Sequence, residues 1–102
     1  MKLGVVVTDI NQSQLALETI WAALDRAWPV RCFLTDDAVN MVKDAGFIDM
    51  ARHEQTNVSM CEHSAERYCK DVDLDAISDV IVVGGQYQDA ELVRNSEQVL
   101  VF

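Results

Sequence analysis

Short apolar runs alternate along the chain with stretches whose apolar residues recur every three or four positions. The runs predict β-strands at residues 3–7, 30–34, 56–60, 79–84 and 99–102. The first is a continuous valine-rich run, which is typical of a strand buried on both faces of a parallel sheet. The stretches between the runs predict amphipathic helices. This alternation indicates a mainly parallel sheet with helices on both faces, because right-handed crossovers place them there.

The helix boundaries follow from capping and breaking residues. The first predicted helix covers residues 12–27 and stops before Pro29, and it carries Trp21 and Trp28 seven positions apart on one face. The second begins after Thr35-Asp36-Asp37 and ends at Gly46, which we expect to cap its C-terminus. Residues 47–55 leave a choice between a short extra helix and a loop. Further helices are predicted at 62–70 and 87–94, with room for another helical turn in the connection 72–78.

Length and composition limit the number of domains. The chain has 102 residues, half of them hydrophobic, which is enough for one compact domain with a core and too little for two. We therefore expect residues 1–102 to form a single three-layer α/β/α domain with a five-stranded, mainly parallel sheet. The strand order stays open between a flavodoxin-like winding and related ones.

Charge and cysteine content narrow the partners and the compartment. Eight basic and seventeen acidic residues give a net charge of −9, which repels phosphate backbones and anionic membranes. No apolar run is long enough to cross a membrane, and the opening run is too short for a signal-peptide core. Three irregularly spaced cysteines favour reduced thiols. We therefore expect a cytoplasmic protein that binds neither nucleic acid nor membranes.

Cys61 is the strongest candidate for chemistry, because it lies where a strand is predicted to end and a helix to begin. Unpaired backbone N–H groups and the positive end of a helix dipole favour the thiolate there. His63 and Arg67, one helical turn apart, can add positive charge, whereas Glu62 opposes it. Functional groups of parallel sheets collect at the carboxyl ends of strands. Here those loops begin at Thr8-Asp9, Thr35-Asp36-Asp37, Cys61 and Gly84-Gly85-Gln86-Tyr87.

The other two cysteines are predicted to be structural. Cys69 shares a helix face with Ala65, Tyr68 and Val72, and Cys32 lies within a strand, so both should pack in the core. Cys61, His63, Cys69 and His53 do not show the paired spacing of zinc frameworks, so we expect no metal site.

The acidic loops invite comparison with receiver domains, whose acidic rim binds magnesium. In this chain, however, Cys61 occupies the position of the phosphorylated aspartate, and no lysine follows the fifth strand. We therefore expect Asp36 or Asp37 to cap a helix. A nucleotide site is also not expected, because the loop after the first strand contains no glycine.

Taken with these motifs, the chain resembles the DsrE/DsrF-like family of small sulfur-relay proteins. The resemblance covers the valine-rich first strand without a nucleotide loop, residues 30–39, the cysteine after the third strand and residues 98–102. It implies that Cys61 carries sulfur as a persulfide and that the partners are sulfur-donor and sulfur-acceptor proteins. It also implies a homo-oligomer, a trimer or hexamer first and a dimer next. Some members of the family lack the cysteine or serve as partner subunits.

Three hypotheses follow for function. The leading one is a sulfurtransferase or sulfur carrier in which Cys61 accepts and passes on sulfane sulfur without a cofactor, assisted electrostatically by His63 or Arg67. The alternative is a noncatalytic oligomeric subunit or binding module in which Cys61 is incidental. A third, a thiol redox sensor, requires a second thiol within reach of Cys61.

Overall fold

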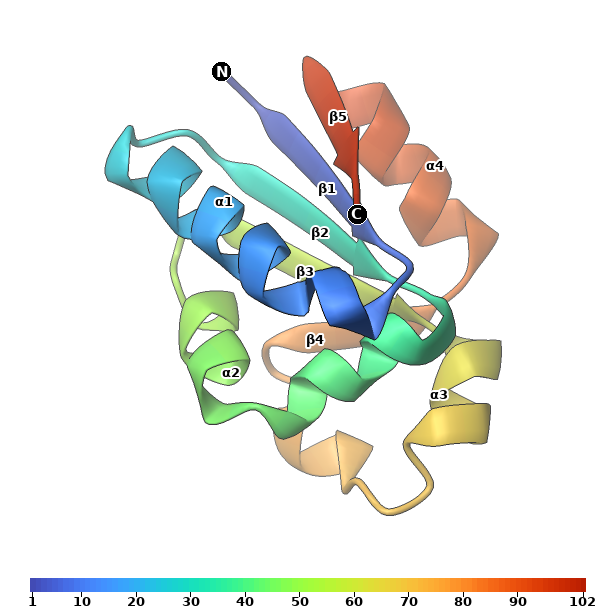
Figure 1. Cartoon of the computed structure of the whole chain (residues 1–102). Helices are drawn as coiled ribbons and strands as arrows, with labels where there is room; N and C mark the ends of the chain where they lie inside the picture. The colour runs from blue at the N-terminus through green and yellow to red at the C-terminus, as the bar shows by residue number, and fades with distance from the viewer.

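One five-stranded sheet organises the chain in the computed structural model, which describes residues 1–102 (Figure 1). Every pair of neighbouring strands is parallel, and their order is β4-β3-β2-β1-β5. The predicted α/β class is therefore confirmed, and the order is a winding related to the flavodoxin order of 2-1-3-4-5 but different from it. The strands are β1 (Leu3–Val7), β2 (Val30–Leu34), β3 (Thr56–Cys61), β4 (Ile81–Gly84) and β5 (Gln98–Val101).

The helices cover the two faces of the sheet unequally. From β1 to β4 the chain advances one strand at a time, whereas β5 returns to lie beside β1. Right-handed crossovers therefore place the last connection on the opposite face. That connection is α4 (Gln86–Asn95), which covers its face alone (Figure 1). The first three connections contain α1 (Ser13–Asp25), α2 (Ala45–Ala51), α3 (Glu62–Tyr68) and the 3₁₀ helices η1 (Ile10–Gln12), η2 (Asp36–Lys43) and η3 (Leu74–Ile77).

The main core lies between the sheet and the helices of the first three connections. Its strand residues alternate with residues that face α4, as a period of two requires. Apolar side chains of these strands and helices are fully buried against one another, among them Val5, Val7, Leu34, Met60, Ile20, Phe47 and Met50. The same alternation places Gly4, Phe33, Ser59 and Cys61 on the α4 side.

The segment after β2 differs from the prediction of one helix ending at Gly46. Residues 36–43 form the 3₁₀ helix η2. Asp44 then adopts an extended conformation, which separates η2 from α2. The Asp44 carboxylate accepts a hydrogen bond from the Gly46 N–H at 3.1 Å, so Gly46 lies in the first turn of a new helix. The prediction that Gly46 is a C-cap is therefore wrong. Of the two options for residues 47–55, the short helix is present, and it ends at Ala51.

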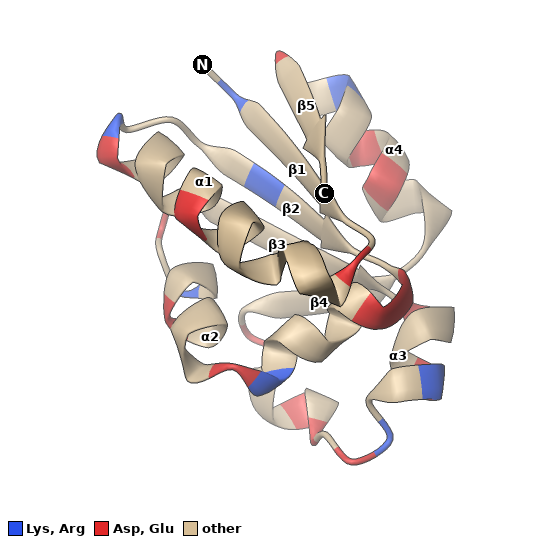
Figure 2. Cartoon of the chain, in the orientation of Figure 1, with Lys and Arg blue, Asp and Glu red and all other residues tan.

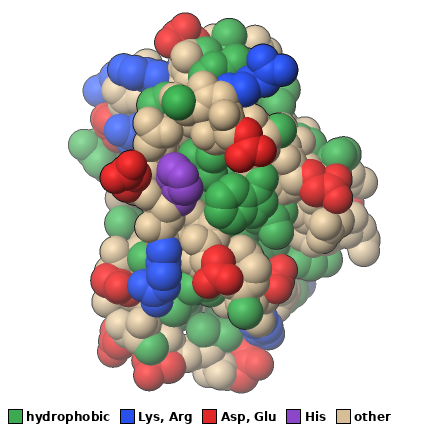
Figure 3. Space-filling view, turned by 90° about the vertical axis from the view of Figure 1, so that its left-hand side faces the viewer, with side chains coloured by type: hydrophobic (Ala, Val, Ile, Leu, Met, Phe, Trp, Pro, Cys, Tyr) green, Lys and Arg blue, Asp and Glu red, His purple; other side chains and the backbone are tan.

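The expected pairing of Trp21 and Trp28 on one helix face is also wrong. Helix α1 ends at Asp25, and Ala27 takes a left-handed conformation with φ of 60°, which turns the chain away before Trp28. The Arg26 guanidinium carbon instead lies over the Trp28 ring, 5.5 Å from the ring centroid. Trp21 packs edge-on against His53, with ring centroids 6.2 Å apart. Figure 3 shows hydrophobic side chains gathered beside a histidine on the side of the molecule that carries α1 and α2.

Candidate functional site

Cys61 lies in a pocket of about 420 Å³ at the carboxyl ends of the strands. It is the last residue of β3 and the N-cap of α3, and its side chain is half-buried. The pocket draws on β1, β2, β3 and the turn before α4, and its lining residues are Val6, Thr8, Phe33, Thr35, Cys61, His63, Gly85, Gln86 and Asp89. The loops that the sequence placed at this edge therefore do meet around the thiol.

The register of the sheet explains why these residues meet. Leu34 pairs with Met60 and Val7 pairs with Leu34, so the next residues along, Thr8, Thr35 and Cys61, lie side by side. Cys61 itself pairs with Gly84 of β4, which brings the β4–α4 turn to the thiol. Four consecutive strands thus contribute one edge residue each.

The surroundings of Cys61 stabilise its thiolate. Burial by itself raises the pKa of the thiol, but four nearby hydrogen-bond donors outweigh burial and lower the pKa below its ordinary value. The donors are the backbone N–H and the hydroxyl of Ser64, the backbone N–H of His63 and the hydroxyl of Thr35. In this structure the Cys61 side chain accepts no capping hydrogen bond from the first turn of α3. We therefore expect these donors to tighten around the sulfur when it carries a charge.

Ser64 links the thiol to the loop after β2. Its buried hydroxyl oxygen accepts a hydrogen bond from the Asp36 N–H at 2.9 Å, which leaves the hydroxyl proton free to point at Cys61. Asp36 has a φ of 52°, a left-handed conformation that is uncommon outside glycine. Ser64 therefore both fixes this loop and presents a donor to the sulfur.

The other two cysteines are core residues, as predicted. Cys32 is 1% exposed, and burial raises its pKa to about 12. Cys69 is 2% exposed, and its thiol donates a hydrogen bond to the Val39 carbonyl at 3.5 Å. Burial raises the pKa of Cys69, with Asp71 adding to the rise and Lys43 opposing it. Cys61 is thus the one thiol of the chain with an open, thiolate-stabilising environment.

His63 and Arg67 differ in their relation to Cys61. His63 lines the pocket and offers its backbone N–H to the thiol. The Arg67 guanidinium carbon lies 5.2 Å from the centre of the Tyr68 ring, and Arg67 does not line the pocket. The structure therefore brings His63 to the candidate site and leaves Arg67 outside it.

The acidic residues of the rim hold loops in place. The Asp9 carboxylate accepts from the Asn11 N–H at 2.9 Å and caps η1. Asp37 also serves η1, because its carboxylate accepts from the Ile10 N–H at 2.9 Å. Asp37 therefore caps a helix, as expected of Asp36 or Asp37, but the helix is the neighbouring η1. No three His, Cys, Asp or Glu side chains are grouped so as to hold a metal ion.

Comparison with known proteins leaves this site to be interpreted from its geometry. The chain matches no family model, and it matches no curated protein. None of its helices has the length and apolar character needed to cross a membrane.

Proposed function

We propose that this chain is a sulfur-relay protein of the DsrE/DsrF type, in which Cys61 accepts sulfane sulfur and passes it on. The observation that carries the proposal is the environment of Cys61. It is an accessible thiol with a lowered pKa, in a pocket formed by the carboxyl ends of adjacent strands. A nucleophilic cysteine needs this combination of thiolate and access.

The transfer needs two displacements at sulfur. The Cys61 thiolate attacks the outer sulfur of a donor persulfide, the donor S–S bond breaks, and the donor leaves as its thiolate. Cys61 then carries the outer sulfur as Cys61–S–SH. In the second step, an acceptor thiolate attacks this outer sulfur, the new S–S bond breaks, and the Cys61 thiolate is regenerated. Electrons and atoms balance without an external oxidant or a cofactor.

The residues around Cys61 support both displacements. The Thr35 and Ser64 hydroxyls and the N–H groups of residues 63 and 64 stabilise the thiolate, which is the nucleophile of the first step and the leaving group of the second. The exposed side chain of His63 lies at the pocket, where it can add positive charge when protonated. The pocket gives room for the persulfide-bearing side chain of a donor or acceptor protein in the cytoplasm.

The structure offers little support for the redox-sensor hypothesis. A sensor needs a second thiol near Cys61, but Cys32 and Cys69 are both buried in the core cluster. Cys69 is held against the Val39 carbonyl of η2. Forming a Cys61–Cys69 disulfide would require α3 to unwind.

We also propose that the chain forms a homo-oligomer, a trimer or hexamer first and a dimer next. Several large apolar side chains of the last three elements are exposed, which supports an interface there. Two of them, Val93 on α4 and Val101 on β5, are the residues that we place in the interface.

Selective modification of Cys61 tests the relay. Limiting iodoacetamide near neutral pH should alkylate Cys61 before Cys32 and Cys69, because Cys61 alone combines access with a lowered pKa. Incubation with glutathione persulfide should add one sulfur, about 32 Da by intact mass, that a reductant removes. Cys61→Ser should abolish this adduct, and Cys32→Ala should retain it.

Two results would contradict the relay. One is a sulfur adduct that persists in Cys61→Ser, and the other is a Cys61 that neither alkylates selectively nor loads sulfur. The second result would favour the noncatalytic binding module, in which Cys61 is incidental.

A further inference from the structure

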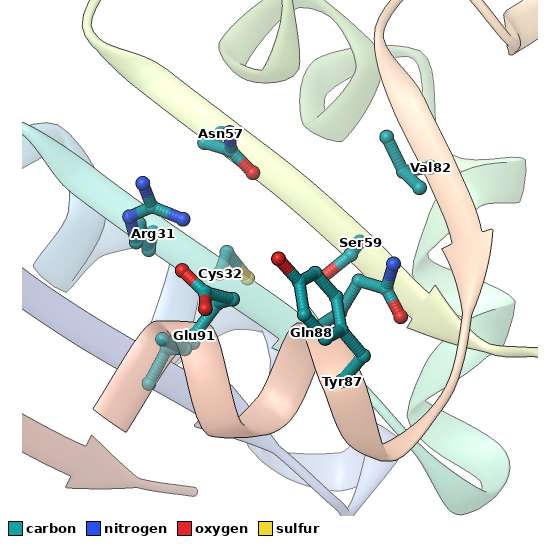
Figure 4. Close-up of a pocket in the computed structure, with 9 residues that line it drawn as sticks. Arg31, Cys32, Asn57, Ser59, Val82, Tyr87, Gln88 and Glu91 are labelled. Atoms are coloured by element: carbon teal, nitrogen blue, oxygen red, sulfur yellow. The ribbon is translucent and has the colours of Figure 1, made fainter. Parts of the chain in front are cut away.

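A second cavity, of about 230 Å³, lies on the other side of α4 from the Cys61 pocket. It opens between α4 and the strands β2, β3 and β4, and it shares no lining residue with the first pocket. Figure 4 shows polar side chains reaching into it from both the sheet and the helix. The lining residues are Arg31, Cys32, Asn57, Ser59, Val82, Tyr87, Gln88, Glu91 and Leu92.

Arg31 supplies a positive charge without a partner in the chain. It is the one charged residue within the five strands, and Figure 2 shows it as a single basic band in β2. Its side chain is half-buried, yet none of the three ion pairs of the chain includes it. A partly desolvated cation without a carboxylate partner is unfavourable. An anionic group in the cavity would relieve this cost.

Further hydrogen-bonding groups lie next to Arg31. Asn57 pairs with Arg31 in the parallel register, so the two side chains project from neighbouring positions on the same face of the sheet (Figure 4). Ser59, two residues along the same face of β3, is 5% exposed and lines the cavity, to which it adds a hydroxyl. The Tyr87 hydroxyl approaches from α4 (Figure 4).

Glu91 decides which kind of anion fits. Glu91 lines the cavity, and its carboxylate forms an ion pair with Arg94 at 3.2 Å and accepts from Asn95 at 3.0 Å, but it does not pair with Arg31. A phosphate dianion at Arg31 would be repelled by this carboxylate. A zwitterion places its carboxylate at Arg31 and its ammonium group at Glu91. The apolar walls formed by Val82 and Leu92 suit a small apolar side chain.

We propose that this cavity binds a free α-amino acid with a small apolar side chain. The ligand carboxylate pairs with Arg31 and accepts from Asn57 and Ser59, and the ligand ammonium group pairs with Glu91. The cavity is smaller than the roughly 300–1,000 Å³ of pockets for drug-sized ligands, which matches a ligand of this size. The proposal is independent of sulfur transfer at Cys61.

Three matched probes test the proposal by NMR of the full ¹⁵N-labelled chain. They are L-valine, isovalerate, which lacks the ammonium group, and isobutylamine, which lacks the carboxylate. L-valine should shift the amides of residues 31, 57, 59 and 88 saturably, with a Kd on the order of 1 mM. Isovalerate should bind about tenfold more weakly, and isobutylamine should cause no saturable shift.

Matched variants separate the contacts. Arg31→Gln should weaken L-valine binding at least about tenfold, whereas Arg26→Gln, which removes an equal charge on the α1 side, should not. Glu91→Gln should make L-valine and isovalerate bind alike. If Arg31→Gln fails to fold, the exposed substitution Asn57→Asp should block binding by placing a carboxylate beside Arg31. The proposal is wrong if no probe binds saturably, if isovalerate equals L-valine on the wild-type chain, or if the shifts centre on Cys61.

Discussion

At the scale of single residues, the reactivity of Cys61 depends on side chains far from it in sequence. Thr35 comes from the end of the neighbouring strand, and Ser64 is fixed by the Asp36 backbone. The three thiols have the same intrinsic chemistry, but burial raises the pKa of Cys32 and Cys69 while hydrogen-bond donors lower that of Cys61. Helix α3 has only seven residues, so these local donors contribute more to thiolate stability than a macrodipole does.

Removing the Ser64 hydroxyl should therefore change the pH dependence of Cys61. The lowered pKa means that the thiolate appears at lower pH than in an ordinary cysteine, so the alkylation rate rises with pH through a lower midpoint. Ser64→Ala should move this midpoint to higher pH, and Thr35→Val should do so to a smaller extent. The measurement is the rate of Cys61 alkylation as a function of pH, read by peptide mass spectrometry.

The same substitution has a second expected effect and a clear control. Ser64→Ala leaves the Asp36 N–H without its acceptor, which should lower the free energy of unfolding by about 1 kcal/mol. Ser78→Ala removes an exposed hydroxyl that bonds only to the Asp75 carbonyl, so it should leave the Cys61 midpoint unchanged. An unchanged midpoint in both Ser64→Ala and Thr35→Val would show that these hydroxyls do not set the pKa of Cys61.

The sequence predicted the position of Cys61 but not its hydrogen-bond donors. A cysteine between a predicted strand and a helix pattern can be recognised from local periodicity. Thr35 follows directly after β2, and its hydroxyl could have been assigned to Cys61 only with the β2–β3 register, which periodicity does not give. Arg67 was expected near the thiol from helical spacing, but spacing fixes only the Cα position. A long side chain can turn away, and here it lies on Tyr68.

At the scale of elements, the close contact between β1 and α4 provides a direct test of the packing. A Cβ at Gly4 would lie 2.6 Å from the Ser96 Oγ and 2.7 Å from the Leu92 Cδ2. Gly4→Ala should therefore force the Leu92 and Ser96 side chains to shift and lower the free energy of unfolding by about 1–3 kcal/mol in urea titrations. The expected loss measures how tightly the single helix on this face is packed.

Gly46→Ala is the matched control for this test. A Cβ there meets only the Asp44 carboxylate, with its nearest atom at 3.5 Å, an ordinary contact, and the residue lies in the first turn of α2. Alanine should stabilise the chain by up to about 1 kcal/mol, because it reduces the entropy of the unfolded state. Equal effects of the two substitutions would contradict the packing of α4 on β1.

Strands were easier to predict than the helices that connect β2 to β3. Short apolar runs bounded by polar turns mark β1 and β2 at their observed limits, because few other structures bury such short runs. In residues 36–51, by contrast, apolar spacing fits both a 3₁₀ and an α-helix. The break at Asp44 depends on one backbone conformation and one carboxylate cap, which a hydrophobic pattern does not reveal.

At the scale of the whole molecule, the strand order leaves the two faces of the sheet with unequal cover. The alternation of elements fixes the α/β class, but it does not say that β5 returns beside β1. A fifth strand beside β4 would show the same periodicity as one beside β1. That return places a single ten-residue helix on one face. The uneven cover leaves the second cavity open and Val82 and Val101 exposed at opposite edges of the sheet.

This uneven cover leads to a prediction about assembly. Val93 on α4 and Val101 on the edge strand β5 are 56% and 68% exposed, and burying them between copies of the chain would remove apolar surface from water. Light scattering at micromolar concentration should therefore give a mass that is a multiple of the 11.4 kDa monomer. Val93→Lys combined with Val101→Lys should shift the population towards the monomer, because each lysine would have to be desolvated in the interface. Leu15→Lys, at an exposed position of α1 that is equally apolar, should leave the mass unchanged. A wild-type chain that scatters only as a monomer would show that this surface has no role in self-association.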